Sequence, residues 1–317
     1  MAKVLIVGGI GQIGSELTVA LRRKHGGDNV VVSDVRDDFP DYIKEGGPCE
    51  RFNVLDLEAQ KKVVERYGVD TVYQLASLLS ATGEKSPDAA FEINLKGLKN
   101  TLDICREKGV KRVFWPSSIA AFGPTTPRKN TPQRTVLEPS TMYGVTKVAG
   151  ELLCQYYFTK YGMDIRSVRY PGLVSWKTPP GGGTTDYAVA IFYEALLRGK
   201  YECFVSKKTT LPMMYMPDAI RGTIELMDAP ARKLTVRTSY NLAAESFSAQ
   251  ELADEVANLV PGFECTYKPD ARQAIADSWP QSIDDSPARK DWGWKHEYGI
   301  SKMASDMVKN LKVTLKK

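Results

Sequence analysis

The sequence predicts an α/β protein in which a doubly wound parallel sheet is followed by a smaller α/β lobe. Three observations support this class. Short apolar runs rich in Val and Ile alternate with amphipathic stretches through the first half of the chain, and this alternation is typical of parallel sheets. A glycine-rich turn joins the first apolar run to the first amphipathic stretch. After residue 172 a Pro- and Gly-rich loop and shorter, mixed segments replace the alternation.

The apolar spacing locates the expected strands and helices. It places strands at residues 4–7, 30–33, 50–53, 71–75, 112–115 and 165–169, and helices at 12–23, 58–67, 89–108 and about 186–198. In the helix at 89–108, one apolar stripe is formed by Phe91, Leu95, Leu98 and Leu102. Such a stripe is typical of a helix face that packs on a core.

Composition disfavours several classes of protein. The 317 residues are 43% hydrophobic, which is ample for a large core. No run of about 18 apolar residues occurs, so we expect no membrane span. The net charge of +5 comes without a cluster of basic residues, so we expect no nucleic-acid partner. The first residues lack the apolar stretch of a secretory signal, and we expect a cytoplasmic protein.

The number and spacing of the cysteine and histidine residues argue against a metal site. The five cysteines are dispersed and form no CxxC pair, which is typical of reduced thiols. The only histidines are His25 and His296. A zinc site and a Ser-His-Asp hydrolase are therefore disfavoured, and no metal is expected.

A glycine-rich turn directly follows the first strand. Gly8, Gly11 and Gly14 have the spacing GxxGxxG, and glycine permits a tight turn and close approach of the backbone to a pyrophosphate. Gln12 and Ile13 open the next helix, whose N-terminal N–H groups and positive dipole attract that anion. Many loops match a glycine pattern by chance, but the strand before and the helix after supply the expected context. The turn predicts a dinucleotide bound to a Rossmann domain.

Asp34 ends the second predicted strand, twenty residues after Gly14. A carboxylate there accepts hydrogen bonds from the adenosine ribose hydroxyls and repels a 2′-phosphate, which favours NAD over NADP. Arg36 qualifies this preference, because a nearby arginine can accommodate the phosphate. The alternative interpretation of Asp34 is a plain turn residue.

Tyr143 and Lys147 are one helical turn apart and form the candidate catalytic pair. Tyrosine is a poor base near neutral pH because its pKa is about 10. We expect the ammonium and the positive nicotinamide ring of the cofactor to lower that pKa, so that the phenolate accepts a proton from a substrate hydroxyl. Ser117 and Ser118 end a strand at the sheet edge where such sites gather and would hold the substrate oxygen. The alternative interpretation of Tyr143 and Lys147 is an ordinary pair on a helix surface. The alternative interpretation of Ser117 and Ser118 is a pair of serines that cap a loop.

Taken together, these motifs resemble the extended short-chain dehydrogenase/reductase superfamily, the group related to UDP-galactose 4-epimerase. The resemblance covers nearly the whole chain and adds the segments NLKG at 94–97, SSIAAFG at 117–123 and RYPG at 169–172. It implies that NAD is the cofactor and that Ser118 carries the catalytic hydroxyl, with Ser117 beside it. It further implies cofactor contacts at Asn53, Val54, Leu75, Ala76, Ser77, Asn94, Tyr143, Lys147, Tyr170, Gly172 and Leu173. Gln74 stands where the superfamily usually has histidine.

Within this superfamily the chain is more similar to the branch that oxidises L-threonine. This closer resemblance rests on LLSA at 78–81, GTTDYA at 183–188, LPMMYMPDA at 211–219 and DSWP at 277–280. It implies oxidation of the C3 hydroxyl of L-threonine to 2-amino-3-oxobutanoate, with reduction of NAD. The zinc-dependent enzymes with the same activity are excluded, because their Cys/His ligand set is missing.

Besides Ser118 and Tyr143, four residues are candidates for the substrate side. The hydroxyls of Thr184 and Thr185, and the N–H groups of the helix that follows, would receive the substrate carboxylate; the alternative is an ordinary helix N-cap. Ser80 would bind the amino or carboxylate group, and Trp279 would close the pocket, although a purely structural tryptophan fits its position equally. Asp186 is expected to point away from a bound carboxylate.

The glycine-rich segment at 176–185 is expected to be a mobile lid that closes over the substrate and excludes water.

The resemblance also implies a domain division and an assembly. We expect an NAD-binding domain at residues 1–172, to which residues 217–242 return, and a substrate lobe at 173–317. A homodimer is expected through the helices around 89–108 and 143–160. Two other functions stay open, namely a UDP-sugar epimerase or dehydratase and a non-catalytic NAD-sensing protein.

Overall fold

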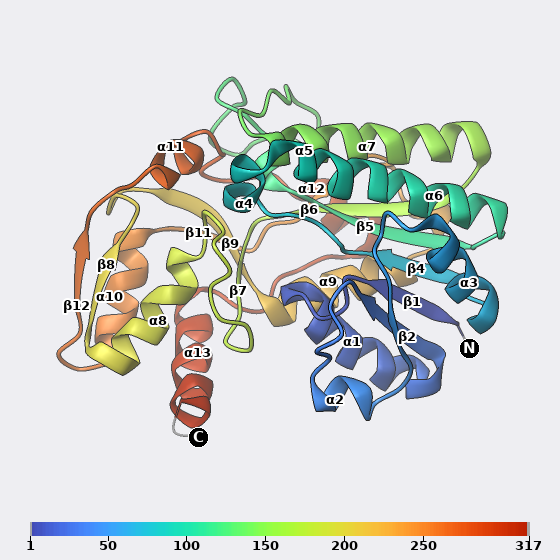
Figure 1. Ribbon diagram of the computed structural model, residues 1–317. Coiled ribbons are helices and arrows are strands. Elements are labelled where there is room, and N and C mark those ends of the chain that lie inside the picture. The colour runs from blue at the N-terminus through green and yellow to red at the C-terminus, as the bar shows by residue number, and fades with distance from the viewer. Residues whose placement is uncertain (1, 316–317) are drawn as a thin grey trace.

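The computed structural model describes residues 2–315 and shows a large sheet covered by helices on both faces, with a smaller lobe beside it (Figure 1). Within the described residues, the large sheet has seven strands in the order β10-β6-β5-β4-β1-β2-β3, and every neighbouring pair is parallel. This is the predicted doubly wound sheet, so the fold class is confirmed. The strand order reverses between β1 and β4, and ligands of such sheets bind at that switch point.

The six expected strands all form, with ends that differ by a few residues. The sheet consists of β1 (Val4–Val7), β2 (Val30–Asp34), β3 (Cys49–Arg51), β4 (Thr71–Gln74), β5 (Arg112–Ser118), β6 (Asp164–Tyr170) and β10 (Tyr240–Asn241). The short strand β10 was not expected as a strand. It pairs with β6, although it follows the first segments of the smaller lobe in sequence. The domain division at residue 172 stays a prediction.

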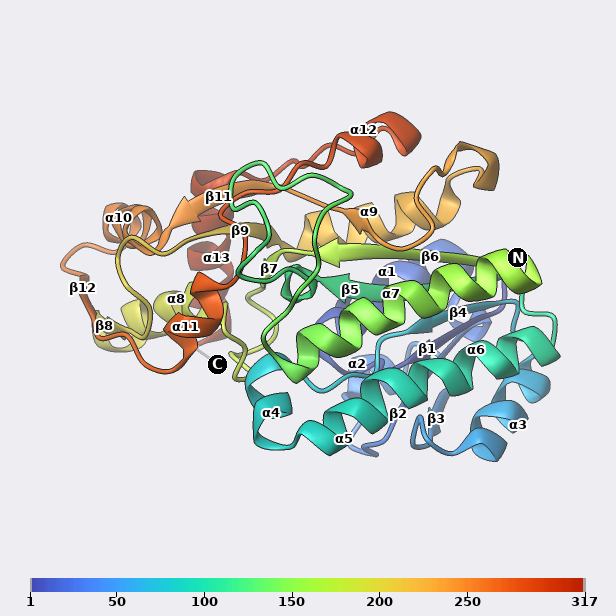
Figure 2. The same ribbon diagram turned by 90° about the horizontal axis from the view of Figure 1, so that it is seen from above.

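Helices pack on each face of the large sheet. One face is covered by α1 (Gln12–His25) and α9 (Met216–Asp228), and the other by α3 (Leu57–Tyr67), α6 (Gly97–Glu107) and α7 (Met142–Tyr161). Figure 2 shows α6 and α7 running side by side across their face. Buried Val, Ile and Leu side chains of β1 point to both faces, because both faces are covered.

The helix expected at 89–108 forms from Pro87 to Glu107, but the apolar stripe expected along it is wrong. A π-helical turn at Glu92–Lys96 separates α5 (Pro87–Phe91) from α6. The wider turn rotates the residues before it relative to those after it, which breaks the apolar stripe. Leu98 and Leu102 are fully buried, whereas Phe91 is 47% exposed.

The smaller lobe holds the second core. Its strands are β7 (Gly172–Val174), β9 (Thr210–Tyr215) and β11 (Glu245–Ser248) in one sheet, with β8 (Lys200–Cys203) and β12 (Glu264–Tyr267) in another. Its longer helices are α8 (Tyr187–Arg198), α10 (Ala249–Leu259) and α13 (Ile300–Thr314). The shorter helices of the chain are α2 (Asp41–Lys44), α4 (Ser80–Lys85), α11 (Arg272–Asp277) and α12 (Ser286–Trp292), with 3₁₀ turns at Gly27–Asn29, Ile119–Ala121 and Ala231–Lys233. Across residues 2–315, no helix is both long and apolar enough to cross a membrane.

The connection from β5 to α7 is closed by a tight contact at Gly123. A Cβ atom on Gly123 would lie 1.7 Å from the carbonyl oxygen of Glu138. The N–H of Gly123 also donates to the hydroxyl of Thr126 at 3.1 Å. The loop can therefore close only around glycine, and its closure sets where α7 begins.

We predict that Gly123→Ala lowers the free energy of unfolding by about 1–3 kcal/mol, because the added methyl group meets backbone that cannot move aside cheaply. The measurement is the midpoint of urea unfolding. Gly181→Ala is the matched control, since a Cβ there has no neighbour within 4 Å. An equal loss of stability in both variants would contradict the steric account.

Candidate active site

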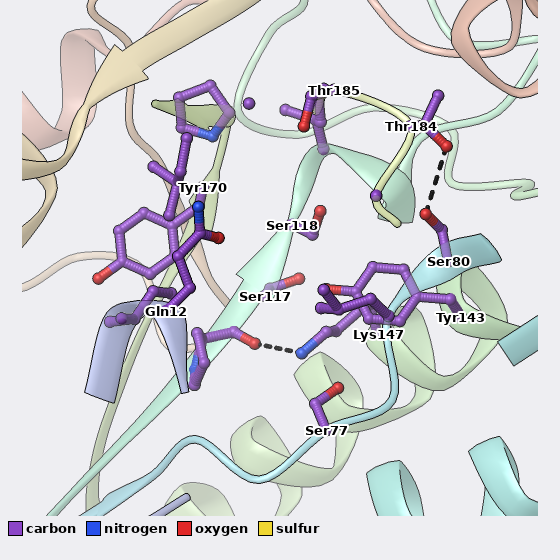
Figure 3. Close-up of a pocket in the computed structure, with 18 of the residues that line it drawn as sticks. Gln12, Ser77, Ser80, Ser117, Ser118, Tyr143, Lys147, Tyr170, Thr184 and Thr185 are labelled. Carbon is purple, nitrogen blue, oxygen red and sulfur yellow. Dashed lines mark hydrogen bonds between the residues drawn. The ribbon is translucent and has the colours of Figure 1, made fainter. Parts of the chain in front are cut away.

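The carboxyl ends of β4 and β5 and the start of α7 meet the smaller lobe around one hollow (Figure 3). Of the residues expected at the site, this hollow brings together Gln12, Ile13, Leu75, Ser77, Ser80, Ser117, Ser118, Tyr143, Lys147, Tyr170, Gly172, Leu173, Thr184, Thr185 and Trp279. Segments more than 200 residues apart in sequence thus line one cavity. The position matches the crevice in which ligands of open α/β sheets bind.

A second hollow adjoins the first and shares Leu75 and Ser77 with it. Of the expected cofactor contacts, it is lined by Gly8, Gly11, Asp34, Arg36, Asn53, Val54, Leu75, Ala76 and Ser77. The residues that line the two hollows extend from Asp34 to Tyr143, an arrangement that suits an extended dinucleotide. Gly14 and Asn94 line neither hollow.

The glycine turn fits a pyrophosphate. Gly8 has a φ of +83°, and a Cβ there would lie 2.7 Å from the backbone nitrogen of Ala76. A Cβ on Gly14 would lie 2.3 Å from the carbonyl of Gly8, so both glycines are needed for internal packing. A Cβ on Gly11 would meet only the Gly8 carbonyl, at 3.4 Å. In the described structure no side chain caps the N-terminus of α1 and its first turn holds no acidic residue, which leaves N–H groups for an anion.

Asp34 and Arg36 form one small network at the end of β2. The carboxylate of Asp34 accepts the N–H of Ile10 at 3.3 Å and that of Arg36 at 3.2 Å. The Arg36 guanidinium bonds to the Ile10 carbonyl at 2.9 Å and lies 3.5 Å from Asp34. The carboxylate is thus held at the end of β2, where Asp34 lines the second hollow.

Asn94 lies in the π-helical turn and connects two parts of the site. Its amide oxygen accepts bonds from the Ser77 hydroxyl at 3.0 Å and from the Leu78 N–H at 2.7 Å. Its amide nitrogen donates to the Leu78 carbonyl at 3.0 Å and to the Thr146 hydroxyl at 3.2 Å. Asn94 therefore fastens the loop after β4 to α7. It supports the hollows without lining them.

Two glycines allow α7 to lie close to the end of β5. A Cβ on Gly144 would come within 2.2 Å of the Ala120 carbonyl, and one on Gly150 within 2.4 Å of the Trp115 ring. Between them, Lys147 is 2% exposed, and its ammonium donates to the Pro116 carbonyl at 2.6 Å. The ammonium also lies 4.6 Å from the centre of the Trp115 ring and 5.2 Å from that of Tyr143.

Burial shifts the pKa values of the pair away from the charged forms, opposite to the direction expected with NAD bound. Burial raises the pKa of Tyr143 to about 12, and the nearby Ser118 hydroxyl offsets part of that rise. Burial also lowers the pKa of Lys147 to about 7, against an opposing effect of Glu151. Loss of hydration favours the neutral form of both groups. The ammonium alone does not lower the phenol pKa below its ordinary value.

The two serines at the end of β5 differ in their contacts. Ser117 is 2% exposed, and its hydroxyl donates to a carboxylate oxygen of Glu151 at 2.6 Å. The Ser118 hydroxyl lies nearer the phenol and also accepts the N–H of Ala120 at 3.2 Å. Ser118 therefore fits the expected role of holding a substrate oxygen. Ser117 is engaged with Glu151, so a direct catalytic role for it is disfavoured.

Hydroxyl groups from both lobes meet on the substrate side. Ser80 in α4 and Thr184 before α8 lie with their oxygens 3.3 Å apart (Figure 3). The N-cap of α8 is Asp186 rather than either threonine. Trp279 is 5% exposed, lines the hollow and packs in the core of the smaller lobe, so it satisfies both interpretations.

Asp186 also lines the hollow, yet its carboxylate is turned to the glycine loop. One carboxylate oxygen accepts the N–H groups of residues 181, 182 and 183 at 2.7, 2.7 and 2.8 Å. At the other end of the loop, Lys177 forms an ion pair with Glu16 at 3.1 Å, and the Trp176 carbonyl accepts the hydroxyl of Tyr193 at 3.0 Å. The segment is thus anchored at both ends, as a hinged lid requires. Its closure over substrate stays a prediction.

Several residues of the site were missed from the sequence. Lining residues not anticipated are Val7, Val35, Phe52, Leu78, Leu79, Ile93, Pro116, Ile119, Pro171 and Gly183. Most are apolar or act through the backbone, so their residue type carries no signal. Glu151 had one available signal, since it follows Lys147 by one helical turn.

Comparison with known proteins places the chain in a family. A family model described as the NAD dependent epimerase/dehydratase family matches residues 4–243. An L-threonine dehydrogenase of Cupriavidus necator, solved in its holo form, is 55% identical, with 98% of this chain and 99% of that chain covered and a TM-score of 0.95. The mitochondrial L-threonine 3-dehydrogenase of Bos taurus is 47% identical over 96% of this chain and 82% of its own length.

Two further structures mark the range of similarity. A monomeric L-threonine 3-dehydrogenase from a metagenome, solved in its apo form, is 48% identical, with 98% of this chain and 99% of that chain covered and a TM-score of 0.94. The UDP-glucose 4-epimerase of Thermotoga maritima is 21% identical with a TM-score of 0.86, over 98% of this chain and 99% of its own, and so shares the fold. The glycine turn, the Tyr143–Lys147 pair and these matches agree, and the chain belongs to the NAD dependent epimerase/dehydratase family.

Proposed function

We propose that this chain is an L-threonine 3-dehydrogenase, which oxidises the C3 hydroxyl of L-threonine to 2-amino-3-oxobutanoate and reduces NAD. The observation that carries the proposal is the meeting of Tyr143, Lys147 and Ser118 in one hollow with the paired hydroxyls of Ser80 and Thr184. The first set suits oxidation of an alcohol, and the second suits recognition of a small polar substrate. Relatives with this activity at 47–55% identity support it.

The chain's own residues supply acid–base chemistry and orientation. The Ser118 hydroxyl holds the C3 oxygen of the substrate, and the Tyr143 phenolate accepts the proton of that hydroxyl. Lys147 is fixed on the Pro116 carbonyl, where its charge stabilises the phenolate. Bound NAD would supply the hydride acceptor for C3 and a positive charge that favours the phenolate. The glycine turn and Asp34 would hold its pyrophosphate and ribose.

Substrate recognition involves both lobes. The hydroxyls of Ser80, Thr184 and Thr185 bind the carboxylate of threonine. Trp279 forms one wall of the pocket. Because Ser80 belongs to one lobe and Thr184 to the other, bound substrate joins the two lobes across the hollow. The order of the loop at 176–185 then depends on the substrate.

The two alternative functions are less well supported. A UDP-sugar enzyme needs basic groups for a diphosphate, but Lys147 is the only basic side chain among the described residues that line the main hollow, and it is buried. A non-catalytic NAD-sensing protein has no need for the buried Tyr143–Lys147 arrangement.

The proposed location is the cytoplasm. The five free cysteines support it, because cytosolic thiols stay reduced.

We expect the purified protein to reduce NAD with L-threonine and not with UDP-galactose, in a panel that includes L-serine, D-threonine and L-allo-threonine. Tyr143→Phe should lower kcat by about 100-fold or more, because general base catalysis is lost. The dissociation constant for NAD should change by less than about twofold, because the phenol hydroxyl is a minor part of a large binding surface. Turnover of UDP-galactose by the wild type, or full activity in the variant, would refute the proposal.

Cofactor choice gives a separate prediction. Asp34→Ala removes the carboxylate that bonds to the ribose and repels a 2′-phosphate, while Arg36 stays in place to receive that phosphate. We expect kcat/KM for NAD to fall by about 10- to 150-fold and that for NADP to rise, as a lost charged hydrogen bond of about 1.5–3 kcal/mol implies. The control is Asp34→Ala/Arg36→Ala, which should lose the gain with NADP. An unchanged preference for NAD in the single variant would show that Asp34 does not select the cofactor.

We further propose a homodimer that forms through α5 and α7. Val145, Leu152 and Tyr156 on α7 are 46%, 57% and 51% exposed, and Phe91 on the adjacent α5 is 47% exposed. Figure 2 shows these two helices together on one side of the molecule. Exposed apolar groups gathered on one face mark protein contacts. The monomeric relative makes the assembly a point to be tested.

Light scattering after size exclusion tests the dimer. The wild type should have the mass of two chains, and Leu152→Lys/Tyr156→Lys should have the mass of one, because two buried charges cannot be paired at the interface. Leu197→Lys on α8, where the leucine is 59% exposed, is the control and should stay dimeric. A wild type of single-chain mass would contradict the proposed assembly.

A further inference from the structure

A buried ion pair lies one helical turn beyond Lys147. Glu151 on α7 is 1% exposed and Arg169 on β6 is 3% exposed. The guanidinium donates to both carboxylate oxygens, at 2.8 and 2.7 Å. Its remaining nitrogen donates to the Gln133 carbonyl and the Asn241 side chain, both at 3.1 Å. The two charges are therefore joined by a bidentate pair, and the guanidinium has two further acceptors.

Stability alone does not explain this pair. Removing two charges from water costs several kcal/mol per ion, and a buried pair is often no more stable than apolar residues of the same size. Glu151 also accepts the Ser117 hydroxyl at 2.6 Å. Its carboxylate thus joins α7, β5 and β6 directly beneath the residues that line the hollow, where a fixed negative charge acts on its neighbours through a medium that screens it poorly.

Lys147 is the neighbouring group whose charged form is stabilised by a nearby negative charge. The partners of its ammonium are neutral: the Pro116 carbonyl and the Trp115 ring. The titratable groups that face it are Tyr143, Glu151 and Cys154 on its own helix, with Arg169 of β6 behind Glu151. Burial raises the pKa of the Cys154 thiol, so that thiol is uncharged. Burial lowers the pKa of Lys147, and the charge of Glu151 acts in the opposite direction.

We propose that Glu151 is a positioning residue for the catalytic pair: its carboxylate, pinned by Arg169, keeps Lys147 in the ammonium form and fixes Ser117 at the end of β5. The inference rests on the proposed roles of Tyr143 and Lys147. It assigns to the ion pair a task in catalysis, because Lys147 stabilises the phenolate of Tyr143 only while it carries its charge. Arg169 sets the position of the carboxylate. Its positive charge cancels only part of the effect of Glu151 on Lys147, because the guanidinium lies behind the carboxylate as seen from the ammonium.

The test is the pH dependence of kcat with L-threonine and NAD. Glu151→Gln keeps the shape of the side chain but leaves the Arg169 charge unpaired, which favours neutral Lys147 and raises the pKa of Tyr143. The rise of kcat with pH should move about one pH unit to the alkaline side, and kcat at pH 7 should fall about tenfold. Glu151→Asp keeps the charge, so its profile should stay within about 0.3 pH units of the wild type even if kcat falls.

The double variant Glu151→Gln/Arg169→Gln separates charge from structure. It leaves no unpaired buried charge, so it remains a usable protein if the single variant does not fold. Its pH profile should lie between those of the wild type and Glu151→Gln. The inference would be overturned if both Gln variants had the pH profile of the wild type. It would also be overturned if Glu151→Asp displaced the profile as far as Glu151→Gln does. If the wild type itself does not oxidise threonine, the proposed function fails instead.

Discussion

The close approach of α7 to the end of β5 determines the geometry of the whole site. It is possible because Gly144 and Gly150 lack side chains where the helix meets the Ala120 carbonyl and the Trp115 ring. The approach buries Lys147 on the Pro116 carbonyl and sets Tyr143 beside Ser118. A wider separation would admit water to the ammonium and move the phenol away from the serine. The chemistry therefore depends on a packing contact between a helix and a strand.

That burial has an electrostatic consequence. A phenol and an ammonium removed from water both favour their neutral forms, and burial shifts the pKa of Tyr143 upward and that of Lys147 downward. The charge of Glu151 acts against the loss of the ammonium form, and a bound cofactor would add a further positive charge that favours the phenolate. The ion pair of Glu151 and Arg169 belongs to this balance and not only to the core.

The fold was largely predictable because parallel strands covered on both faces tend to be continuous apolar runs, which the sequence displays in β1, in β2 and in the middle of β5. The two-residue strand β10 was not predictable, since so short a segment has no periodicity. The π-helical turn around Asn94 was missed for a different reason. Its residues continue a helical pattern, and the extra residue in the turn is stabilised by the contacts of Asn94 with Leu78 and Thr146.

The site was predictable where spacing alone implies contact, as for the glycine turn and the Tyr143–Lys147 pair. It was not predictable where burial decides the outcome. The spacing of Ser117 gave no sign that its hydroxyl bonds to Glu151, and nothing in the pattern revealed that Arg169 would pair with that carboxylate. The upward effect of burial on the pKa of Tyr143 was not anticipated for the same reason, because desolvation is a property of the packed structure.

According to the proposed function, a hydride passes from C3 of L-threonine to NAD in this hollow. The most direct measurement uses L-threonine that carries deuterium at C3, with NAD as acceptor. The account predicts slower reduction of NAD than with unlabelled threonine, and deuterium recovered in the reduced cofactor. Reduced cofactor without deuterium, or no reduction of NAD by threonine, would contradict it.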